Sequence, residues 1–90
     1  MLSMTDSAGA RLTDLLTSKA DGSVARIIRN RDRLHLRVGQ LRASDQTFSH
    51  EGRVVLALDM EIASTLSLRE LDLCATSSGK RLRLKSATVL

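Results

Sequence analysis

The pattern of apolar and polar residues is strongest between positions 45 and 59, where two short segments are joined by a Glu-Gly pair at 51–52. Glycine adopts positive φ without a steric penalty, so this pair predicts a tight turn between strands over 46–50 and 53–58. The second segment, RVVLAL, is almost continuously apolar, which is typical of a central strand covered on both faces. The stretch therefore predicts a β-hairpin, and Asp59 after it can cap a following helix.

Apolar residues recur at helical spacing in two other segments. Residues 5–18 predict an amphipathic helix, with Thr5 as its N-cap and Gly22 closing its end in a left-handed conformation. Gly9 lies inside this segment and costs about 1 kcal/mol relative to Ala, so it indicates a close approach to the helix backbone. Residues 60–68 predict a second helix of two turns. The apolar face of the first helix consists of Ala8, Leu12, Leu15 and Leu16.

Four more segments predict strands: three alternate with a period of two, and the one at 24–29 is a short run rich in residues that favour β-structure. Polar turns at 30–32 and 76–79 join them in pairs. The resulting order, α-β-β-β-β-α-β-β with short connections, favours antiparallel sheets with helices packed on them. We therefore predict an α+β fold for a single domain spanning residues 1–90. The four strands cover 24–29, 33–38, 71–75 and 80–85.

The composition limits the size of the core and indicates a compartment. In a chain of 90 residues and 9.8 kDa, Phe48 is the sole aromatic residue, so the core is small and aliphatic and we expect modest stability or support from a partner chain in a homodimer. Cys74 is the sole cysteine, which excludes an intrachain disulfide and a cysteine cluster for a structural metal. Without a leader or a long apolar run, we expect a soluble cytoplasmic protein that makes no membrane contact.

Basic residues give the chain a net charge of +4, and they recur at alternate positions within two of the predicted strands. If those strands share an exposed face, the side chains form a cationic patch that binds carboxylates or phosphates through guanidinium groups. An acidic protein or a nucleic acid would suit such a patch, although the lack of aromatic side chains argues against single-stranded nucleic acid. An ordinary solvated sheet face remains the alternative. The candidate residues are Arg33, His35, Arg37, Arg53, Arg81, Arg83 and Lys85.

Catalytic and metal-binding chemistry has little support in the sequence. Cys74 lies within a predicted strand, where a lone cysteine is usually a small buried residue. His35 and His50, with Glu51 beside the second, are the available metal-binding set, and we interpret them as surface histidines. No nucleophile and base stand at a recognisable spacing, so we predict no enzyme, no catalytic residue, no metal ligand and no cofactor.

Two stretches resemble the A-type iron–sulfur carrier family, also called HesB-like or IscA-like. They are MTDSAGARLTDLL and DQTFSHEGRVVLALDMEIASTLSLRELDL. The resemblance implies a mainly antiparallel β-sandwich in which a short strand and a Thr or Ser precede the first helix. The matching positions are Asp45, Gly52, Val54, Val55, Asp59 and the triplet at 71–73.

The same resemblance implies three cysteine ligands that this sequence does not show. Family members hold iron or a cluster through one cysteine in a loop after the first strands and two in a C-terminal Cys-Gly-Cys, because thiolates are the soft anionic ligands that a cluster needs. Here NRDR stands at 30–33, the sequence ends in SATVL, and Cys74 matches none of the three positions. We therefore expect a degenerate member that acts as an accessory or interaction module in iron–sulfur cluster biogenesis, with an assembly protein as partner. The alternative is a basic module that binds an acidic partner or nucleic acid through its Arg-rich sheet face.

Overall fold

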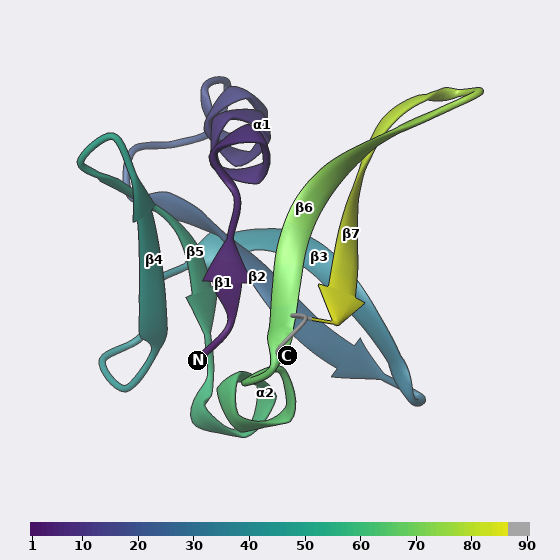
Figure 1. Ribbon diagram of the computed structural model, residues 1–90. Helices are drawn as coiled ribbons and strands as arrows, with labels where there is room; N and C mark the ends of the chain where they lie inside the picture. Colours follow the sequence, from purple (N-terminus) through teal and green to yellow (C-terminus); the bar gives the residue numbers. More distant parts are fainter. Residues whose placement is uncertain (87–90) are drawn as a thin grey trace.

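Residues 1–86 are described by a computed structural model, in which two β-sheets enclose a core between the helices α1 and α2 (Figure 1). The two helices lie at opposite ends of the space between the sheets. The elements are β1 (Ser3–Met4), α1 (Asp6–Leu16), β2 (Ser23–Asn30), β3 (Arg33–Gln40), β4 (Gln46–His50), β5 (Arg53–Leu58), α2 (Met60–Thr65), β6 (Arg69–Thr76) and β7 (Gly79–Ser86).

The strands form one sheet in the order β1-β6-β7 and another in the order β3-β2-β5-β4. Each of the three hairpins is antiparallel, whereas β1 pairs with β6, and β2 with β5, in parallel. The prediction of an α+β, mainly antiparallel sandwich is confirmed. The short connections gave no sign of the two parallel pairs, because each pair joins segments far apart along the chain.

Two hairpins close through two-residue turns in which both residues have positive φ. In the β4–β5 turn φ is 50° at Glu51 and 81° at Gly52, and in the β2–β3 turn it is 51° at Arg31 and 66° at Asp32. Turns of this kind match the right-handed twist of the flanking strands. The predicted hairpin is confirmed.

Both predicted helix caps are present. The Thr5 hydroxyl accepts a hydrogen bond from the Ala8 amide at 3.2 Å, and an Asp59 carboxylate oxygen accepts one from the Ile62 amide at 2.8 Å. The predicted end of the first helix is wrong, because α1 stops at Leu16 and Thr17 follows as its C-cap. Gly22 does have a positive φ of 83°, but it lies in the turn that leads into β2.

The strand β1 is too short to show any alternation in the sequence, and only the family resemblance implied it. Its Met4 stands beside Leu71 of β6, and the Thr5 amide donates to the Leu71 carbonyl at 3.0 Å. The preceding Leu2 is buried. This segment therefore anchors the start of α1 to the three-stranded sheet.

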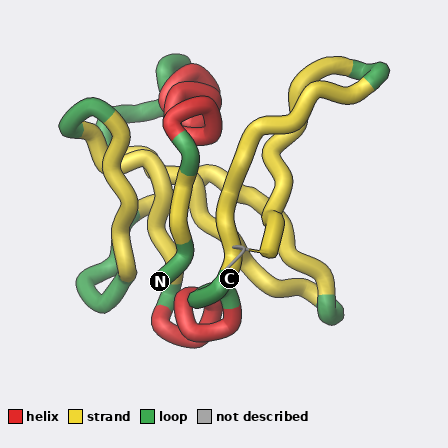
Figure 2. Tube along the Cα trace, viewed as in Figure 1, coloured by secondary structure: helices red, strands yellow, loops and turns green. Residues whose placement is uncertain are grey.

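The core lies between the sheets and is almost entirely aliphatic. All of Val55–Leu58 in β5 is buried, as predicted for a central covered strand, and a register shift opposite Phe48 and Ser49 interrupts the regular alternation of β5 there. The far end of the β6–β7 hairpin projects away from the rest of the molecule, to the side of α1 (Figure 2). No helix within residues 1–86 is long and apolar enough to cross a membrane. The core cluster includes Leu2, Ala8, Leu12, Leu16, Ala25, Ile27, Val55, Leu56, Leu58, Ile62, Ala63, Leu66 and Leu71.

Candidate functional site

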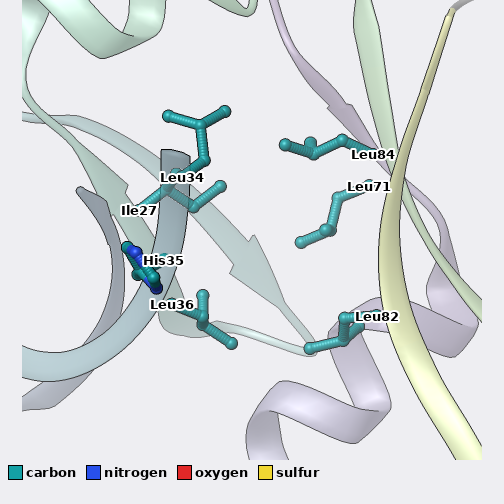
Figure 3. Close-up of a pocket in the computed structure, with 7 residues that line it drawn as sticks. All are labelled: Ile27, Leu34, His35, Leu36, Leu71, Leu82 and Leu84. Atoms are coloured by element: carbon teal, nitrogen blue, oxygen red, sulfur yellow. The ribbon is translucent and has the colours of Figure 1, made fainter. Parts of the chain in front are cut away.

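The two predicted rows of basic residues belong to different sheets. Arg33, His35 and Arg37 are on β3, and the second row, Arg81, Arg83 and Lys85, is on β7. The leucines that alternate with each row face one another across the gap between the sheets (Figure 3). Because side chains alternate along a strand, the arginines of the two rows point outward on opposite sides of the sandwich. The structure therefore does not join them into one patch.

Arg53 lies apart from both rows. It begins β5, is half-buried, and borders a separate hollow together with Gly22 and Leu41. Its guanidinium is therefore not part of a continuous cationic surface with the other candidates.

The outward face of the three-stranded sheet carries an organised polar cluster. Asp72 accepts hydrogen bonds from Lys85 Nζ at 2.6 Å, from Thr5 Oγ1 at 2.7 Å and from the Leu73 amide at 2.8 Å. These bonds lower the pKa of Asp72 to about 2, with the Lys85 contact contributing most, and the same contact raises the pKa of Lys85. Lys85 is thus already paired, whereas Arg81 and Arg83 make no ion pair within the described residues.

The four-stranded sheet holds a buried ion pair that the sequence did not reveal. Arg26 is 6% exposed and the Asp45 side chain 1% exposed; the guanidinium forms a two-pronged contact with the carboxylate. Arg26 also donates to the Gln40 carbonyl at 3.1 Å, while the Arg42 amide donates to Asp45 at 2.8 Å. The pairing lowers the pKa of Asp45 and raises that of Arg26. Asp45, one of the positions behind the family resemblance, therefore fixes the connection between β3 and β4.

The two histidines do not converge on a common site. His35 is on β3 and His50 on β4, at opposite edges of the sheet, and three strand spacings separate them by roughly 14 Å. The His50 ring instead lies against α1, where a Cβ on Gly9 would come within 2.6 Å of Nδ1. The predicted close approach at Gly9 is confirmed. Across residues 1–86, no three His, Cys, Asp or Glu side chains are grouped so as to hold a metal ion.

Cys74 lies on the outward face of β6 and is half-buried, so the prediction of a buried thiol is wrong. Its cross-strand partner on β7 is Arg81. The outward face of this hairpin is built from polar and basic residues, which leaves no apolar layer to cover the thiol.

The position where the resemblance places the first ligand is the β2–β3 turn. Arg31 and Asp32 are its two central residues, and Asn30 pairs directly with Arg33. The position of the Cys-Gly-Cys would follow β7 and lies outside the described residues. The β2–β3 hairpin therefore has no extended loop at the position expected for the first cysteine ligand.

An apolar cleft opens between the sheets, and sequence reasoning missed it. It has a volume of about 220 Å³, and Figure 3 shows leucines of β3 and β7 pointing toward one another across it. The alternation of leucine with basic residues in both strands was visible, but only the tertiary arrangement shows that the two rows of leucines face each other. The cleft is lined by Ile27, Leu34, His35, Leu36, Leu71, Leu82 and Leu84.

No family model and no curated protein matches this sequence. Six chains of solved structures are similar to it, and SufA and IscA are among them. Escherichia coli SufA, which is involved in the biosynthesis of iron–sulfur clusters, has a TM-score of 0.77 at 17% identity over 94% of this chain and 84% of SufA. IscA with a [2Fe–2S] cluster has a TM-score of 0.65 at 16% identity over 96% of this chain and 85% of IscA. The predicted resemblance is confirmed at the level of the fold: the chain has the HesB/IscA-like fold of A-type iron–sulfur carriers.

Proposed function

We propose that this protein is a non-enzymatic, carrier-like domain that has lost the cluster ligands and acts as an accessory or interaction module in iron–sulfur cluster biogenesis. The fold shared with SufA and IscA supports the general role. The observation that carries the loss of ligands is the tight turn at Arg31 and Asp32, which stands where a cysteine-bearing loop is expected.

The chemistry of the side chains supports the same proposal. Clusters are held by several thiolates, and Cys74 is the sole cysteine of the sequence. It is on β6, away from the β2–β3 turn, with Arg81 directly across the hairpin. One thiol in this position supplies one ligand, so a cluster on this chain would depend on cysteines from another molecule.

Anaerobic reconstitution with iron and sulfide tests the proposal. We expect less than about a tenth of an iron per chain after desalting, far below the near-full occupancy of a tight site, with no difference between the wild type and Cys74→Ser. IscA carried through the same procedure serves as the positive control, because its structure holds a [2Fe–2S] cluster. Iron near one equivalent per chain that Cys74→Ser removes would contradict the loss of cluster binding.

The partner, oligomeric state and compartment are part of the proposal. We expect a cytoplasmic homodimer that contacts an assembly protein or another acidic protein, with one domain over residues 1–90. Acidic groups could contact the exposed Arg33 and Arg37 on β3 or the exposed Arg81 and Arg83 on β7. The alternative, one continuous Arg-rich face for nucleic acid, has less support because the rows point to opposite sides.

A further inference from the structure

The cleft between the sheets is bordered by two edge strands. β3 pairs only with β2, and β7 only with β6, within the described residues 1–86. On β3 the inward side chains are left partly uncovered: Leu36 is 37% exposed and Val38 47% exposed. An open edge with exposed apolar side chains is a site where another strand can add.

The other side of β3 defines the charge of a suitable partner. Arg33 and Arg37 alternate with these apolar residues and are exposed, and neither makes an ion pair within residues 1–86. Residues directly opposite one another in a sheet interact, and opposite charges stabilise the pairing. A strand added beside β3 would therefore be apolar on its inward side and acidic on its outward side.

We propose that the free edge of β3 binds an extended segment of a partner protein in which apolar and acidic residues alternate. The apolar side chains would lie beside Leu36 and Val38 and fill the cleft toward Leu82 and Leu84, and the acidic ones would lie beside Arg33 and Arg37. Backbone hydrogen bonds along the edge supply affinity, and the alternating side chains supply specificity. This inference rests on the proposed interaction role and names the chemical class of its partner.

Charge and size favour an acidic segment over the other occupants. A second copy that paired through β3 or β7 would bring basic rows together, and like charges directly opposite one another are destabilising. A small apolar ligand would leave the backbone edge unpaired, and the cleft of about 220 Å³ is smaller than ordinary ligand pockets of roughly 300–1,000 Å³.

The test uses a fluorescent synthetic peptide of about eight residues, the length of β3, in which Leu and Glu alternate. A peptide of the same composition with its Leu and Glu in separate blocks is the first control, and one with Lys in place of Glu is the second. By fluorescence anisotropy, we expect the alternating acidic peptide to bind about tenfold more tightly than either control, and added salt to weaken it.

Variants of the protein locate the site. Arg37→Glu converts an attractive cross-strand pair into a repulsive one, and Val38→Glu places a charge among the inward apolar side chains of β3. We expect each variant to weaken peptide binding about three- to tenfold. Arg11→Glu, the same charge change at an exposed position on α1, is the matched control and should leave binding unchanged. Circular dichroism verifies folding, and slower amide hydrogen exchange along β3 on peptide binding provides a readout without any variant.

Several results would overturn the proposal. They are equal binding of the alternating and block peptides, an equal loss of peptide binding in Arg11→Glu and Arg37→Glu, or unchanged amide hydrogen exchange along β3.

Other occupants of the β3 edge would give different results. A dimer that Val38→Glu dissociates in sedimentation, with no peptide binding, would assign the edge to a second copy. Laurate that binds the wild type when the alternating peptide does not would assign the cleft to a lipid. Iron measured on the same samples separates the two proposals. Protein that is free of iron and does not bind the peptide overturns this inference alone. Protein that is loaded with iron overturns the proposed loss of ligands alone.

Discussion

Two strands of the four-stranded sheet, the central β5 and the edge strand β3, differ in how completely they are covered. At the β4–β5 side, Val55–Leu58 of β5 are all buried, and both α1 and α2 pack against this strand. At the β3 side, the inward residues Leu36 and Val38 remain more than a third exposed, although they face the other sheet. An alternating strand can therefore have its apolar face directed inward and still lack a complete cover.

The largest expected effect comes from truncating a leucine to alanine in each of the two strands. Leu56→Ala empties a site that is 0% exposed, and we expect it to lower the free energy of unfolding by about 3–4 kcal/mol. Leu36→Ala removes a side chain that is 37% exposed, so we expect a loss of about 1 kcal/mol or less. Urea denaturation monitored by circular dichroism measures both losses, and equal losses would contradict the difference in cover between β5 and β3.

The features that the sequence predicted are local ones. The β4–β5 hairpin and the caps at Thr5 and Asp59 follow from turn chemistry and alternation over a few residues. Gly22 misled the prediction because a glycine with positive φ suits the entry to a strand as well as the end of a helix.

The features that the sequence did not predict depend on distant segments. The parallel pair β2–β5 joins strands that are separated along the chain by β3 and β4. The strand β1 is defined by its pairing with β6. The cleft lies between the two sheets, so it can be recognised only when the positions of both sheets are known. The partner of Arg26 is likewise 19 positions away at Asp45. The one available signal was an arginine between apolar residues in VARII, which indicates a buried charge that needs a partner.

That buried pair provides the next largest effect, on the outer face of the sheet. Asp45→Asn keeps the shape of the side chain but removes the negative charge that faces Arg26. A buried arginine without its carboxylate is costly, so we expect a loss of about 3 kcal/mol in the free energy of unfolding. Asp21→Asn, at an exposed position, is the matched control and should change stability by less than about 0.5 kcal/mol. Equal effects from the two variants would show that the Arg26 contact contributes no stability.

The smallest effect concerns Asp72, which joins Thr5 at the start of α1 to the sheet that forms the other wall of the cleft. Its pKa is lowered from 3.8 to about 2 in the folded protein, so the folded state binds fewer protons than the unfolded state in this range. The contribution of Asp72 is therefore fully present above about pH 4 and is lost as the pH falls toward 2. Asp72→Asn should lower the urea midpoint at pH 6 and flatten its decline between pH 4 and 2. Asp45 titrates in the same direction and remains in the variant, so part of the decline should persist. An unchanged pH profile in Asp72→Asn would mean that the contacts with Thr5 and Lys85 do not stabilise the wall formed by β6 and β7.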